Sequence, residues 1–157
     1  MTSRLIAIDI DDRGLVRPTP EMDQERKVAI FDLLEDNFLA IPRAAEFPGP
    51  YRLLLALREG RLVFAISTDQ GQKVAEFHLS LGPFRQVVKY YFQICESYFE
   101  AVRLLPPARI EAIDMARRGI HNEGARVLEE RLEGKAVVDA PTARRLFTLI
   151  CALHWKG

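Results

Sequence analysis

Residues Gly82–Leu105 have the sequence GPFRQVVKYYFQICESYFEAVRLL, which is the densest run of large apolar side chains in the protein. Charged residues fall on one side of a helical projection of this stretch, and Pro83 suits its first turn, whereas Pro106-Pro107 cannot continue it. The other side carries large apolar residues at alternating steps of four and three, the spacing of one helix face: Phe84, Val88, Tyr91, Cys95, Tyr98, Val102 and Leu105. The stretch therefore predicts a helix with a broad buried face.

The length of 157 residues suits one domain with a core of its own. We expect a single domain over residues 1–157, with residues 1–80 mostly sheet plus one helix and residues 81–157 helical. A composition of 48% hydrophobic and 28% charged residues is ordinary for a soluble globular protein. The 22 basic residues balance 22 acidic ones, whereas proteins that bind nucleic acids usually carry a basic excess.

The cysteines and the chain start both favour a cytoplasmic protein. Cys95 and Cys151 lie among apolar residues, which is typical of reduced thiols in a core. The first residues, MTSRLIAIDIDD, become acidic before an apolar secretory segment could form. The longest apolar run, Leu146 to Trp155, is too short to cross a bilayer, so we expect no membrane association.

The N-terminal half predicts a sheet and one helix. Arg4 to Ile10 alternates, with Ile6, Ile8 and Ile10 on one face of a first strand. Thr19-Pro20 is a typical helix start, and that helix runs to about Asp36. A short edge strand is expected at Phe38 to Ile41. Three longer strands follow, at Tyr51–Leu57, Arg61–Ser67 and Lys73–Leu79. A tight turn at Glu59-Gly60 joins the first two of these longer strands, and the three together predict an antiparallel meander.

After the opening helix, the C-terminal half predicts three further helices and a short strand at Ala136 to Val138. Two helices are expected at Pro107 to Arg118 and at Glu123 to Glu133. Gly119 is expected to cap the C-terminus of the first, and the connection Ile120-His121-Asn122 leads to the second, with Asn122 as its N-cap. Asp139 or Ala140 caps the last helix, which is apolar nearly all round from Leu146 to Trp155 and is therefore buried or in an interface. The predicted fold class is α+β: an antiparallel β-meander with an N-terminal helix, then a helical half packed on one sheet face.

Several stretches together resemble a family of small bacterial proteins, the uncharacterised protein family numbered 0262. The resemblance runs nearly end to end, and the last three stretches are the most specific: RLIAIDIDD, KVAIFDLLEDN, PYRLLLAL, RLVFAI, PFRQVVKYYFQICESYF, IEAIDMARRGIHNEG and TARRLFTLICALHWKG. It implies a cytoplasmic bacterial protein, and it implies no activity, cofactor or catalytic residue.

One candidate ligand site lies around the expected helix break and the start of the last helix. Guanidinium, imidazole and helix N-terminal amides at such a junction suit a phosphate or a carboxylate. The six candidate ligand-binding residues are Arg117, Arg118, His121, Glu123, Arg144 and Arg145. Two other interpretations stay open: the first arginines cap a helix C-terminus, and the last two form internal salt bridges.

Three other sites receive less support. A helix-turn-helix over Ile110 to Leu132 would place four glutamates on its DNA-reading helix, which argues against DNA binding. Cys151 and His154 could share a metal or pair as nucleophile and base, but they lack a second ligand pair and an electropositive setting. The acids Asp9, Asp11 and Asp12 suit a solvated turn as well as a cation. The sequence indicates no resident metal and no cofactor.

Two functional hypotheses follow. The aromatic residues Tyr90, Tyr91, Tyr98 and Phe99 and the apolar last helix exceed what one small sheet covers, which favours a homodimer or another protein partner. The first hypothesis is therefore a non-enzymatic binding or regulatory protein that acts through a protein partner. The second is a small-molecule site, enzymatic or not, at the six candidate residues. Convergence of those side chains on one pocket would favour the second hypothesis, and their division among separate ion pairs the first.

Overall fold

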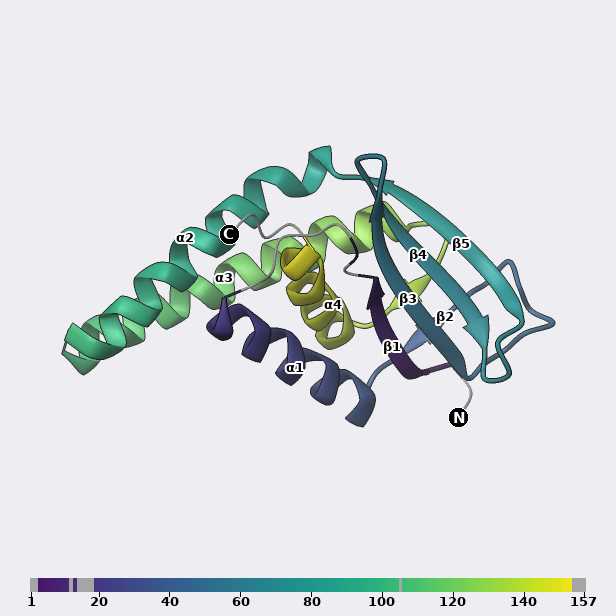
Figure 1. Ribbon diagram of the computed structural model, residues 1–157, viewed down its shortest axis with the longest axis horizontal. Helices are drawn as coiled ribbons and strands as arrows, with labels where there is room; N and C mark the ends of the chain where they lie inside the picture. The colour runs from purple at the N-terminus through teal and green to yellow at the C-terminus, as the bar shows by residue number, and fades with distance from the viewer. Residues whose placement is uncertain (1–2, 12, 14–18, 105, 154–157) are drawn as a thin grey trace.

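A sheet lies on one side of the molecule and the helices lie together on the other in the computed structural model, which describes residues 3–11, 13, 19–104 and 106–153 (Figure 1). The described part is α+β, and its helices follow the sheet in the chain except for the first one, α1 (Pro20–Glu35). The predicted fold class is confirmed.

The four-stranded sheet has the order β1-β3-β4-β5. Strands β3 (Tyr51–Arg58), β4 (Arg61–Thr68) and β5 (Lys73–Ser80) form the predicted antiparallel meander. The β3–β4 turn is the expected tight one, with Glu59 and Gly60 both at positive φ, 52° and 73°. Strand β1 (Leu5–Asp11) pairs parallel to β3, so the sheet is mixed rather than purely antiparallel. The helix α1 (Pro20–Glu35) lies in the long connection that such parallel pairing requires.

The prediction of which β1 residues face the core is wrong at the start of the strand. The pairing with β3 is irregular between Leu5 and Ala7, and this irregularity turns Leu5 into the core. Leu5 is fully buried, Ile8 is 7% exposed and Ile6 is 39% exposed. Asn37 fixes this end of β1, because its side chain accepts from Leu5 N at 2.7 Å and donates to Leu5 O at 3.0 Å.

Helices α2 (Gly82–Leu104) and α3 (Pro107–Leu132) form a long antiparallel hairpin that extends away from the sheet (Figure 1). The predicted buried stripe of α2 is confirmed at Phe84, Val88, Tyr91 and Cys95, which are at most 5% exposed. The side chains expected further along the stripe, Val102 and Leu105, lie outside the described part of the molecule, as does that of Phe99.

Helix α4 (Ala140–Leu153) packs against both α1 and α3. Its side chains from Leu146 to Cys151 are all buried, so this helix is an internal element. Of the two expected locations, the core and an interface, the core is the one observed. His154 and Trp155, the end of the predicted apolar run, lie outside the described residues. Asp139 is the N-cap, since its Oδ1 accepts from Thr142 N at 3.0 Å.

The predicted break between two helices at residues 119–122 is wrong, because α3 runs through it without interruption. Gly119 is exposed on a helix surface with open space around it. Gly124 lies at the crossing with α4, where a Cβ atom would come within 2.5 Å of the Phe147 ring. Gly124 therefore serves close helix packing, and this packing, with Ala125 and Leu128 buried in the core, overrides the local termination signals.

The predicted short strands at Phe38–Ile41 and Ala136–Val138 pair with one another. Strands β2 (Leu39–Ala40) and β6 (Val137–Val138) make a two-stranded antiparallel ribbon. Thr142 Oγ1 accepts from Phe38 N at 3.0 Å nearby, so the segment after α1 is tied to the start of α4.

Candidate functional site

The six candidate residues come from the middle of α3 and the first turns of α4, and the helix terminus expected among them does not exist. Three of them lie within electrostatic reach of one another: Arg117 and Arg144 both act on the charge of His121. The other three, Arg118, Glu123 and Arg145, lie apart from this group with partners of their own.

Arg117 forms an ion pair with Glu25 of α1, a residue that is not among the six candidates. The two side chains are 17% and 21% exposed, and the Arg117 guanidinium lies 5.4 Å from the centre of the Tyr98 ring. Burial alone would lower the pKa of Arg117, but the charge of Glu25 outweighs burial and raises that pKa above its ordinary value. Arg117 is therefore a permanent cation that joins α3 to α1.

His121 is a half-buried, neutral imidazole packed among aromatic rings. Its ring centre lies 5.0 Å from that of Tyr91 and 6.3 Å from that of Phe147. Its Nε2 lies 3.4 Å from Thr148 Oγ1, and this hydroxyl donates to Arg144 O at 3.3 Å. Burial lowers the pKa of His121 to about 4, assisted by the charges of Arg117 and Arg144 and opposed by Asp114. At neutral pH this ring adds no positive charge for an anion.

The remaining three candidates make separate surface contacts. Arg118 pairs with Asp114 at 2.8 Å on α3 itself. Glu123 pairs with Arg126 at 2.5 Å, and the hydrogen bond from Arg126 lowers the pKa of Glu123. Arg145 donates to Asp36 O at 3.3 Å, beside the C-terminal end of α1. Internal contacts therefore account for these three residues.

A surface hollow of about 570 Å³, which no sequence pattern predicts, opens beside the Glu25–Arg117 pair. The described residues that line it are Pro20, Glu21, Gln24, Glu25, Val28 and Arg117. All except Arg117 belong to the first turns of α1. Their shared helix face can be derived from their spacing, but nothing in the sequence indicates that α3 closes the hollow from the other side.

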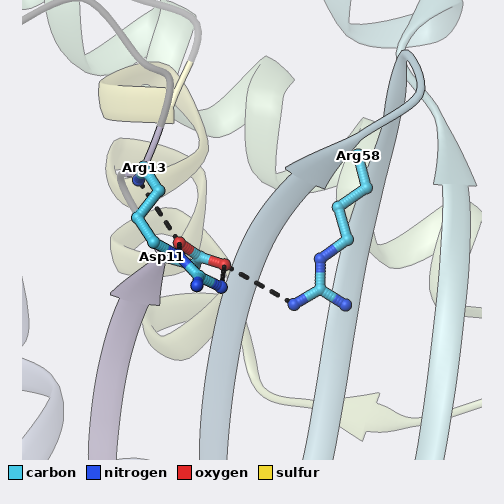
Figure 2. Close-up of polar contacts among 3 residues, drawn as sticks. All are labelled: Asp11, Arg13 and Arg58. Atoms are coloured by element: carbon cyan, nitrogen blue, oxygen red, sulfur yellow. Dashed lines mark hydrogen bonds and ion pairs between the residues drawn. The ribbon is translucent and has the colours of Figure 1, made fainter.

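The carboxylate of Asp11 is held by two arginines. Arg13 and Arg58 converge on it at the end of β1 (Figure 2). Arg13 donates to both Asp11 oxygens at 2.8 Å, and Arg58 lies at 3.5 Å. The hydrogen bond from Arg13 holds the pKa of Asp11 well below its usual range. Asp12 lies outside the described residues, and among the residues that are described no group of His, Cys, Asp and Glu could hold a metal ion.

The two cysteines are free thiols in the core, as predicted. Burial raises the pKa of the Cys95 thiol and raises that of Cys151 well above its ordinary value. Both are therefore protonated at neutral pH and are poor nucleophiles. His154, the expected neighbour of Cys151, lies outside the described residues.

Within the described part of the chain, no helix combines the length and the apolar character needed to cross a membrane.

A family model described as Uncharacterised protein family (UPF0262) matches residues 2–156. The chain belongs to UPF0262. A UPF0262 protein of Cereibacter sphaeroides (strain ATCC 17029) is 70% identical over 156 residues, which are 98% of this chain and 99% of the relative. UPF0262 proteins of Paracoccus denitrificans and Roseobacter denitrificans are 71% and 66% identical, over 96% and 99% of this chain and 95% and 99% of their own lengths. No solved structure matches the chain. The predicted resemblance to UPF0262 is confirmed, and the names of these relatives state no activity, ligand or partner.

Proposed function

We propose that this UPF0262 protein is a non-enzymatic cytoplasmic binding or regulatory protein that acts through a protein partner. The partner contacts the α1 outer surface, which we define as Pro20, Glu21, Gln24, Val28 and Phe31. The observation that carries the proposal is the exposure of two large apolar side chains beside a hollow: Val28 is 46% exposed and Phe31 is 64% exposed.

The spacing along α1 supports contact with a helical or extended partner segment. Residues 21, 24, 28 and 31 follow steps of three and four, so they form one stripe along the helix. Val28 also lines the hollow, so an apolar side chain of the partner could enter it next to Phe31. Clustered apolar side chains at a surface, aromatic ones above all, carry much of the energy of protein interfaces.

Charge indicates the chemistry of that partner. Carboxylates lie at both ends of the stripe, at Glu21 and Glu35, whereas Glu25 in the hollow is already paired with Arg117. A segment that alternates apolar residues with lysine or arginine complements this pattern. The two buried free cysteines are consistent with the cytoplasm.

A matched pair of variants tests the proposal. Phe31 and Met115 are both 64% exposed, on α1 and α3 respectively, so a glutamate at either position leaves the fold in place. Affinity capture from native cytosol is expected to recover a protein partner with the wild type and with Met115→Glu, and to lose it with Phe31→Glu. Equal recovery with Phe31→Glu, or no recovery with the wild type, would overturn the proposal.

Binding of a small anion is a second candidate function, and a specific arrangement favours it. Arg117 and Arg144 both lie close enough to His121 for their charges to lower its pKa. Arg117 Nε and the Tyr91 hydroxyl are buried donors without a hydrogen-bond partner among the described residues. Against it, Glu25 already neutralises Arg117, and the hollow does not extend to His121 or Arg144.

Titration with inorganic phosphate, followed by the melting temperature, tests this second candidate. A saturable rise is expected in the wild type and in Arg145→Ala, whose guanidinium bonds to Asp36 O. The rise is expected to vanish in Arg144→Ala. The absence of any rise in the wild type removes the candidate.

A further inference from the structure

In the part of the chain that the structure describes, strand β5 has a hydrogen-bonding partner on one side only. The sheet order ends at β5, and β4 pairs with it from Lys73 to Ser80. Within the described residues, no main-chain hydrogen bond reaches residues 73–80 from any other segment. One row of N–H and C=O groups along this strand is therefore free to pair.

This edge lacks most of the features that prevent edge-to-edge pairing. It is eight residues long, contains no proline, and keeps a regular register with β4 from Ala75 to Ser80. Short length, proline and bulges are the usual protection of edge strands. The protection that remains is the polar side chains of Lys73, Glu76 and His78.

The two polar residues near the strand centre are an acid and a base. Glu76 and His78 lie on the outer sheet face, opposite Ala65 and Val63 of β4. Their side chains are 33% and 44% exposed, and Glu76 Oε2 lies 2.7 Å from His78 Nε2. An acid and a base two residues apart on one face complement the same pair when a second strand runs antiparallel.

We infer that β5 pairs with β5 of a second copy of this chain, antiparallel about a two-fold axis at Phe77. Glu76 then lies opposite His78 of the second copy, and His78 opposite its Glu76. Phe77 faces its own counterpart on the inner side, and Ala75 faces Leu79. Two sheets of the order β1-β3-β4-β5 become one continuous sheet, with the helices of both copies on the same face.

Neighbouring symmetric registers are less favourable. An axis at Glu76 opposes two carboxylates, and an axis at His78 opposes two imidazoles and leaves Glu76 facing Ser80. The axis at Phe77 alone among these pairs unlike residues on the outer face and two aromatic rings on the inner face. The inference concerns the opposite side of the molecule from α1, and it is independent of the proposed partner surface (Figure 1).

Charge substitution tests the pairing in solution. Sedimentation velocity is expected to show a dimer for the wild type and for Phe31→Glu, which leaves β5 unchanged. His78→Glu places two carboxylates opposite one another at two symmetric positions, whereas Glu76→Lys replaces each pair of an acid and a base by a lysine opposite an imidazole. We expect each variant to raise the dimer dissociation constant about tenfold. The double variant Glu76→Lys, His78→Glu restores unlike pairs and is expected to restore the dimer.

Disulfide trapping tests the register. A mixture of Glu76→Cys and His78→Cys proteins under mild oxidation is expected to form an interchain disulfide, because directly opposite residues lie about 5 Å apart. Either variant alone is expected to form none, since Cys95 and Cys151 are buried and like positions are diagonal. A wild-type monomer at the highest concentration reached, a dimer indifferent to both charge variants, or a disulfide in Glu76→Cys alone would overturn the inference.

Discussion

The contact between Gly124 and Phe147 can be measured with two glycine-to-alanine variants of the same helix. A Cβ atom at residue 124 would lie 2.5 Å from three carbons of the Phe147 ring, about 1 Å closer than ordinary contact. Overpacking of this kind destabilises by about 1–3 kcal/mol. Around Gly119 no atom lies within 4 Å of the same position, so only the helix-propensity gain of about 0.5–1 kcal/mol applies there.

Because both variants share the propensity gain, their difference isolates the clash. Urea unfolding followed by circular dichroism is expected to show Gly119→Ala more stable than the wild type, and Gly124→Ala less stable than Gly119→Ala by about 1–3 kcal/mol. Phe147→Leu introduced with Gly124→Ala is expected to recover part of that difference. A destabilised Gly119→Ala, or equal free energies for the two variants, would refute a continuous α3 packed against α4.

Three further changes probe other contacts. Burial lowers the pKa of His121 from 6.5 to about 4, so between these pH values the unfolded chain binds a proton and the folded chain does not. The contribution of His121 to stability is fully present above pH 6.5 and is lost as the pH falls towards 4. At pH 5 the unfolding free energy is expected to be about 2 kcal/mol lower than at neutral pH. His121→Gln should remove this part of the difference in unfolding free energy between pH 7 and pH 5, and an unchanged difference would contradict the buried neutral imidazole. Asn37→Ala loses the hydrogen bonds to Leu5 N, Leu5 O and Leu33 O, and it is expected to lower the unfolding free energy in urea by about 2 kcal/mol. A change within about 0.5 kcal/mol, the size of a neutral surface substitution, would contradict a stabilising role for these bonds. Asp139→Ala is expected to lower the unfolding free energy by about 1 kcal/mol through loss of the α4 cap, whereas Asp139→Asn should lose little; equal losses would argue against the cap.

The strands and the long helix α2 could be predicted from the sequence because their signals are local. Alternating apolar residues between glycine turns predict β3, β4 and β5 to within a residue or two of their observed ends. The same holds for the Thr19-Pro20 start of α1, where Thr19 Oγ1 accepts from Met22 N at 3.2 Å. Each of these features depends on residues a few positions apart.

The predicted break within α3 is wrong because glycine is found both at helix ends and where two helices pack closely. Gly119 and Asn122 have the composition of a helix end, but termination is decided by what packs around the segment. Gly124 is required by the Phe147 ring of α4, and that contact is visible only once the two helices are in place. The irregularity that exposes Ile6 likewise has no local signal, because the pairing of β1 with β3 produces it.

The candidate site illustrates the same limit. Arg117 and Arg118 are equivalent as neighbours in the chain, yet Arg117 pairs with Glu25 across the interior and Arg118 with Asp114 on the surface. The homodimer was expected from the aromatic residues of α2 together with the apolar α4, and the apolar side chains of α4 are covered within one copy. A second copy therefore stays a prediction, and its support comes from the edge of β5.

Photo-crosslinking at two positions tests most directly whether the α1 outer surface, rather than the arginine-rich part of α3, meets a partner. A photoreactive residue is introduced in place of Phe31 in one variant and in place of Arg118, whose side chain is 75% exposed, in another. Our account predicts a covalent adduct with another protein from position 31 and none from position 118 after irradiation of intact cells. An adduct from position 118 alone, or from neither position, would contradict it.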